Sequence, residues 1–61
     1  MMVFKDLWRL LPNNQKIILR DAFDLLILYK DIAEDIPYKY MEYYVNAVAA
    51  VGNCLVIDIC N

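Results

Sequence analysis

The chain has 61 residues, a formal net charge of −2 and a composition in which 62% of the residues are hydrophobic. This length allows one domain, residues 1–61, which can bury only about 60% of the surface that its unfolded chain exposes. The six lysines and arginines are scattered, which excludes the clustered phosphate contacts of a nucleic-acid-binding protein. Because so much apolar surface exceeds what a small monomer hides, we expect a homo-oligomer or a complex with a protein partner.

Several residue types that carry enzyme chemistry are absent from the chain. It contains no histidine, serine or threonine, and therefore lacks the usual general base, the hydroxyl nucleophiles and the commonest metal ligand. The only glycine, Gly52, excludes a glycine-rich phosphate loop. The acidic residues Asp31, Glu34 and Asp35 show no metal-loop spacing. The sequence predicts a protein without catalytic activity, cofactor or metal.

The two cysteines and the apolar C-terminal third of the chain indicate where in the cell the protein is expected. Cys54 and Cys60 are six residues apart, a spacing that does not bring them to disulfide distance on a helix or a strand. With no secretory pattern at the N-terminus, we expect reduced thiols and a cytoplasmic protein. The apolar stretch 45–60 contains polar residues and is too short to span a membrane. The abundance of Ile, Asn, Lys and Tyr fits an AT-rich genome, such as that of many phages and low-GC bacteria.

The first predicted element is a helix over residues 3–11. Phe4, Leu7, Trp8 and Leu11 follow the i, i+3, i+4, i+7 spacing of one apolar stripe. Pro12 ends this helix, because the residue before a proline is driven out of the helical region.

The second predicted element is a long helix over residues 15–34, capped by Asn13 or Asn14. Its charged residues fall in one arc and most of its apolar residues lie opposite. Ile17, Ile27 and Leu28 fall inside the polar arc instead. We therefore interpret these three residues as candidates for a second interface.

The third predicted helix starts near Pro37, with Asp35 as its cap, and runs from residue 38 to at least residue 51. Tyr43 lies on its polar edge and is a candidate partner contact. Residues 54–60 are expected to continue the helix or to form a short fourth one. The alternative is a strand in which Leu55, Ile57 and Ile59 share a face and pair with another subunit. The predicted fold class is all-α, a small bundle of three to four helices.

The segment FKDLWRLLPNN, residues 4–14, resembles the transactivation peptide of the cellular tumour antigen family of transcription factors. The resemblance rests on Phe4, Trp8 and Leu11 at the family's spacing, with Asp6-Leu7 before the tryptophan and Leu10-Leu11-Pro12 after it. It implies that Phe4, Trp8 and Leu11 dock into the groove of a double-minute-type ubiquitin ligase. The competing interpretation, which we favour, is that the same stripe closes the protein's own core.

These observations predict a small non-enzymatic intracellular interaction module or inhibitor that binds a protein partner, and itself, through apolar helix faces. The candidate partner-binding residues are Phe4, Leu7, Trp8, Leu11, Ile17, Ile27, Leu28 and Tyr43. One alternative is a peripheral membrane protein with Trp8, flanked by Lys5 and Arg9, in the headgroup region. Another is a purely structural subunit that only self-assembles.

Overall fold

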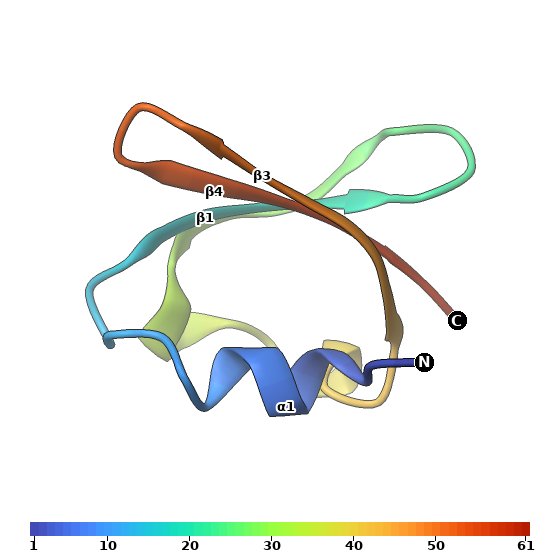
Figure 1. Ribbon diagram of the computed structural model, residues 1–61, viewed down its shortest axis with the longest axis horizontal. Coiled ribbons are helices and arrows are strands. Elements are labelled where there is room, and N and C mark those ends of the chain that lie inside the picture. Colours follow the sequence, from blue (N-terminus) through green and yellow to red (C-terminus); the bar gives the residue numbers. More distant parts are fainter.

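The structure, a computed structural model that describes residues 1–61, places a four-stranded sheet over a layer of short helical segments (Figure 1). The chain begins with a single α-helix, continues through a strand hairpin and two 3-10 turns, and ends in a second hairpin. The elements in order are α1 (Phe4–Trp8), β1 (Lys16–Asp21), β2 (Ile27–Ile32), η1 (Ala33–Asp35), η2 (Tyr38–Tyr40), β3 (Tyr44–Val51) and β4 (Cys54–Cys60).

The strands follow the order β2-β1-β4-β3, so the two hairpins lie side by side. The central pair, β1 and β4, is parallel, with Ile17 opposite Leu55 and Leu19 opposite Ile57. The outer pairs, β1 with β2 and β3 with β4, are antiparallel. β2 and β3 are consequently the two edges of the sheet.

The core lies between the sheet and the helical layer. Alternate residues of the central strands point into it, because successive side chains of a strand face opposite sides. Ile17, Leu19, Ile57 and Ile59 are completely or almost completely buried. The helical layer adds five buried residues: Phe4, Ala33, Ile36, Tyr40 and Met41. The other face of the sheet, here called the outer face, has no covering layer (Figure 1).

The prediction of an all-α helical bundle is wrong, and the segment 15–34 shows why. Ile17 and Leu19 are buried while Ile18 between them is only half-buried, so the true period is two residues and not 3.6. The misfit of Ile17 on the helical wheel was the sign of this period, whereas Ile27 and Leu28 lie in β2, whose burial does not alternate. The segment is a hairpin of β1 and β2, with a bulge that leaves Leu28 without a register partner.

The prediction of a helix over residues 38–51 is also wrong. Ala47, Ala49 and Ala50 favour a helix by intrinsic propensity, but here they belong to β3, because packing of a whole sheet overrides weak local preferences. Gly52 and Asn53 form a two-residue hairpin loop. Gly52 has a φ of +60°, as the first central residue of a type II′ turn requires. The alternative for residues 54–60 is correct in that they form a strand, but wrong in its pairing with another subunit, because this strand pairs with β1 and β3 of the same chain.

The first helix forms but is shorter than predicted. α1 ends at Trp8, and the chain then turns through 3-10-type bonds in which Leu10 and Leu11 donate to the carbonyls of Leu7 and Trp8. Its first amides are capped from outside: Phe4 N donates to Tyr43 O at 2.7 Å and Lys5 N to Met41 O at 3.0 Å. Tertiary contacts therefore hold this helix in place.

Candidate interaction surfaces

The loop between β1 and β2 presents the most concentrated apolar surface of the molecule. Phe23 is 85% exposed, Leu26 65%, Ile27 57% and Leu25 51%. We call these four side chains the hairpin tip. Isolated exposed apolar residues are ordinary, but four in five consecutive positions are typical of a binding surface.

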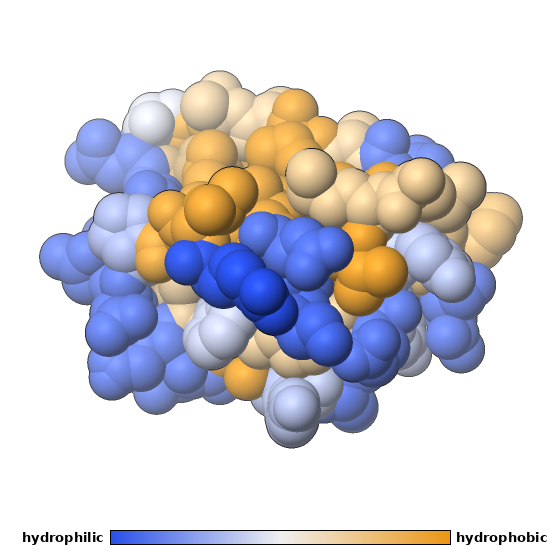
Figure 2. Space-filling view, turned by 60° about the horizontal axis from the view of Figure 1, so that its bottom comes forward, coloured by the Kyte–Doolittle hydropathy of each residue, from blue (hydrophilic) through white to orange (hydrophobic).

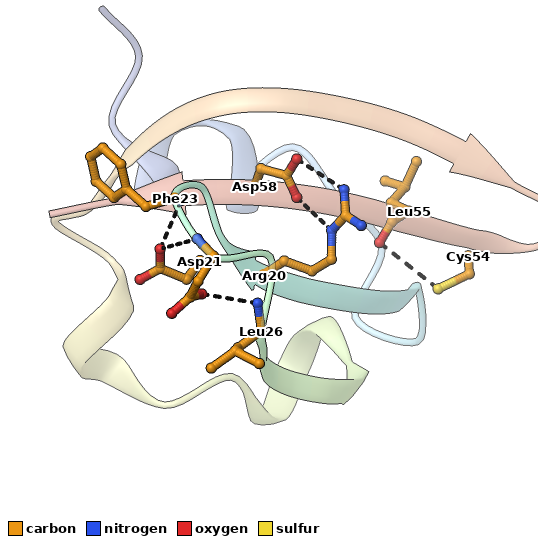
Figure 3. A network of polar contacts seen from close by, with 8 residues as sticks. Arg20, Asp21, Phe23, Leu26, Cys54, Leu55 and Asp58 are labelled. Carbon is orange, nitrogen blue, oxygen red and sulfur yellow. Dashed lines mark hydrogen bonds and ion pairs between the residues drawn. The ribbon is translucent and has the colours of Figure 1, made fainter.

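Side-chain caps hold the backbone of this loop (Figure 3). Asp21 Oδ1 accepts hydrogen bonds from the amides of Phe23 at 2.8 Å and Asp24 at 3.4 Å, and Asp24 Oδ1 accepts one from Leu26 N at 3.0 Å. Leu25 N also donates to Asp21 O at 2.8 Å. Because the side chains of Asp21 and Asp24 accept these backbone hydrogen bonds, the backbone of the loop is ordered and its apolar side chains are held outward.

Leu25 adopts a left-handed conformation, with φ of 60°. A residue with a Cβ pays roughly 1–2 kcal/mol for this conformation, which glycine adopts without strain. The loop thus keeps an exposed leucine at a position where glycine would fit better. Backbone strain of this kind is concentrated at functional sites in proteins.

Next to the hairpin tip, an ion pair crosses the centre of the outer face (Figure 3). Arg20 on β1 donates through Nε to Asp58 Oδ1 at 2.7 Å and through a terminal nitrogen to Asp58 Oδ2 at 3.0 Å. This two-bond contact with Asp58 raises the pKa of the Arg20 guanidinium, which stays charged. Ile18 and Val56, both half-buried, flank the pair. The outer face therefore combines a central ion pair with aliphatic side chains.

Tyr29 has a pKa above the usual value for a tyrosine. It lies on β2, packs against the core, and donates its hydroxyl to Ile32 O at 2.7 Å. Burial raises the pKa of Tyr29 above its usual value of 10.0, and the negative charges of Asp31 and Asp35 raise this pKa further. The phenol is therefore held in its neutral form.

Tyr29 is expected to make the fold sensitive to alkaline pH. Its folded pKa lies above the unfolded pKa of 10.0, so the unfolded chain loses this proton first. The stabilisation is complete below pH 10 and is lost as the pH rises through the folded pKa. Tyr29→Phe is expected to cost about 0.5–1.5 kcal/mol at neutral pH through the lost hydrogen bond, and to flatten the alkaline fall in stability. Urea unfolding from pH 7 to pH 11 measures both effects. If the unfolding free energy of the two proteins fell equally steeply with pH above pH 10, the raised pKa of Tyr29 would be contradicted.

The structure places seven of the eight predicted partner-binding residues in or against the core. Phe4 and Ile17 are fully buried, with exposed fractions of 0% and 1%. Five others are half-buried and pack against the core cluster: Leu7, Trp8, Leu11, Leu28 and Tyr43. Only Ile27 is exposed, as part of the hairpin tip. The predicted set therefore does not form one surface.

Trp8 shows how the stripe of the first helix is used. Its indole Nε1 donates to Ala33 O at 2.7 Å, which joins α1 to η1, and its ring packs against the core. Tyr43 lies edge-on to Tyr40, with ring centroids 5.5 Å apart. Docking of Phe4, Trp8 and Leu11 into another protein's groove would require Phe4 to leave the core.

Sequence reasoning missed Phe23, Leu25 and Leu26, because it placed them inside a helix. The signal that could have found them is Asp21 and Asp24, since aspartate side chains bond to backbone amides two or three residues ahead and so favour turns. Two such residues around an apolar run between β-branched segments indicate a hairpin loop.

The helical side of the molecule offers a less concentrated surface. Figure 2 shows hydrophilic side chains across the middle and lower part of this side, with hydrophobic ones mainly above them. A hollow beside α1 is lined by Trp8, Ile36 and Met41, with the charged residues Lys5 and Glu34 at its rim. Its apolar part belongs mostly to the core and not to an exposed patch.

The structure contains no group of three or more acidic, cysteine or histidine side chains positioned to hold a metal ion. Cys54 and Cys60 are free and half-buried. No helix in this structure has both the length and the apolar composition that a membrane crossing requires. Comparisons with protein-family models, with curated proteins and with solved structures found no match, so any functional inference rests on the geometry described above.

Proposed function

We propose that this protein is a non-enzymatic interaction module that inserts the hairpin tip into an apolar pocket of a protein partner. The observation that carries the proposal is the exposure of Phe23, Leu25 and Leu26 on one loop with a hydrogen-bonded backbone, next to the exposed first residue of β2, Ile27. Burying a side chain of this size gains about 1.5–3 kcal/mol, so four together supply the anchors of an interface. The capped loop also loses little conformational freedom on binding.

The chemistry of the tip favours a protein pocket over a lipid surface. Asp21 and Asp24 lie among the apolar side chains, and the chain has a formal net charge of −2. Carboxylates at the insertion point are repelled by anionic lipids and lose hydration when they enter a bilayer. A protein pocket can face them with donors at defined positions.

Site-specific photo-crosslinking tests the proposal. A photoreactive phenylalanine analogue at position 23, introduced in cells of the source organism, is expected to give one dominant crosslinked protein. The same analogue at position 38 is the matched control, because Tyr38 is 77% exposed but lies on η2 in the helical layer. The position-38 probe is expected to leave that protein unlabelled.

Variants of the tip then connect binding to the exposed side chains. With the captured protein purified, Phe23→Ser combined with Leu26→Ser is expected to weaken binding at least about 100-fold, since each truncated anchor costs 2 kcal/mol or more. Tyr38→Ser is expected to leave the affinity unchanged. Leu25→Gly is expected to fold with a stability within about 1 kcal/mol of the original, because relief of strain offsets the entropy of glycine, while still binding more weakly.

Two results would overturn the proposal. One is an affinity that the double tip variant leaves unchanged. The other is flotation of the protein with neutral phosphatidylcholine liposomes that Phe23→Ser and Leu26→Ser abolish, which would make the tip a membrane anchor.

A further inference from the structure

The free edge of β3 is a second surface without a partner, separate from the hairpin tip. β3 pairs with β4 on one side. On its other side the N-terminal segment covers only the start of the strand: Phe4 N donates to Tyr43 O at 2.7 Å, Val45 N donates to Met2 O at 2.8 Å, and Val3 forms an isolated bridge with Tyr44. No backbone hydrogen bond covers that side of residues 46–51, which we call the β3 edge.

The β3 edge lacks the usual protection of an edge strand. Natural proteins place charges, prolines or bulges on such strands, because alternate backbone N–H and C=O groups there are free to pair with another chain. Asn46, Ala47, Val48, Ala49, Ala50 and Val51 contain no charge and no proline, and all six are exposed. The bulge of β3 lies between Val45 and Ala47, at the border of the covered part, so residues 47–51 are regular strand.

The opposite edge of the sheet is protected. β2 carries Lys30 and Asp31 side by side, both exposed, and its own bulge falls at Leu28. One edge of this sheet is therefore open to pairing and the other is not. An assembly that uses the open edge ends after two chains and does not grow into a fibre.

We infer that the β3 edge pairs with the β3 edge of a second copy of this chain, in antiparallel orientation about a two-fold axis, and that the dimer contains a continuous eight-stranded sheet. This inference does not depend on the function proposed for the hairpin tip. In such a pairing each residue near the axis meets itself or a close neighbour in the other copy, so any charge there would repel its own copy. The absence of charge, and the small side chains of Ala47, Ala49 and Ala50, satisfy this condition.

The covered start of β3 limits the register of the pair. Because residues 2–4 occupy the edge before residue 46, the open segment is 46–51 and the axis lies near its middle. Paired residues must lie on the same face of the combined sheet, so either Val48 or Ala49 pairs with its own copy. In both registers the two Ala49 side chains lie on the outer face within roughly 8 Å of each other.

Charge exchange at Ala49 tests the inference. The original protein is expected to have twice its 7.2 kDa chain mass by light scattering or native mass spectrometry. Ala49→Lys and Ala49→Glu, each alone, are expected to raise the dimer dissociation constant at least about tenfold through like-charge contact. An equimolar mixture of the two variants is expected to regain the double mass as a mixed dimer.

A charge on the other edge strand is the matched control. Lys30→Glu changes the charge at an exposed position on β2 outside the hairpin tip, and it is expected to leave the dimer intact. Circular dichroism is expected to show that all variants remain folded, because Ala49 and Lys30 are both outside the core. A monomeric original protein at millimolar concentration would overturn the inference, as would a dimer that Ala49→Lys leaves unchanged or a mixture that does not recombine.

Discussion

Replacing Phe4 with alanine is expected to destabilise this protein severely. The Phe4 side chain is completely buried between the sheet and the helical layer. Truncation of a buried phenylalanine costs about 3–5 kcal/mol, because the lost burial is joined by an unfilled cavity. A 61-residue domain has a total stability of only about 3–9 kcal/mol, so this one change removes at least a third of it and as much as all of it. Thermal unfolding followed by circular dichroism measures the effect.

Leu10→Ala is the control for this experiment. Leu10 lies six residues further along the same segment but is 75% exposed, and its truncation is expected to change the stability by less than about 0.5 kcal/mol. The pair of variants also separates the two interpretations of the N-terminal stripe. A Phe4→Ala protein as stable as the original would contradict the core role and return Phe4 to the proposal of a groove-binding helix.

Ile57→Ala is expected to cost about 2–5 kcal/mol, and Val56→Ala on the same strand only about 1 kcal/mol. Ile57 is completely buried and faces the helical layer, between Leu19 on β1 and Val48 on β3. Val56 is half-buried and lies on the outer face. Adjacent residues of a strand point to opposite faces, so adjacent truncations differ sharply. Urea unfolding of the two variants gives the comparison.

The same pair of variants tests the assignment of residues 54–60 as a strand. In a helix, the residues three and four positions from Ile57 would share its burial. We therefore add Cys60→Ala, which replaces a half-buried side chain on the outer face and is expected to have a small effect. If Ile57→Ala and Cys60→Ala lost equal amounts of stability, the result would favour a helix over a strand for residues 54–60.

Parts of the fold could be predicted from local sequence. The helix that begins near Phe4 and the turn before Pro12 are present, because a proline limits the conformation of the residue before it. The break around Pro37 is also present, between η1 and η2. Leu55, Ile57 and Ile59 do share one face, as the strand alternative proposed. The sequence patterns that indicated these features involve neighbouring residues alone, although tertiary contacts hold α1 in place.

The long helices were predicted wrongly because their patterns fit two periods. In β1, a run of three apolar residues, 17–19, satisfies a helical wheel almost as well as a strand that alternates between two faces. In β3, alanines and valines give conflicting propensities. The decision came from pairing between segments about 40 residues apart, such as Lys16 with Cys54, which no local pattern reports.

The candidate surfaces were predictable to different degrees. Ile27 was selected because it did not fit a helix, and it does lie on the hairpin tip. Ile17 was selected for the same reason and is buried, since the misfit reported the strand period and not an interface. The β3 edge could not be predicted from the sequence, because the edges of a sheet can be identified only once the strand order is known.

By itself, the sequence determined the properties that depend on composition and close neighbours: a small acidic chain, an excess of apolar side chains, the absence of histidine, serine and threonine, and chain breaks near Pro12 and Pro37. The tertiary structure decided which apolar residues close the core and which remain outside. Phe4 and Trp8 serve the core, whereas Phe23, Leu26 and the β3 edge remain exposed. The physical reason is that burial is a property of contacts between distant segments, and here the central contact is the pairing of β1 with β4, which lie about 40 residues apart in the chain.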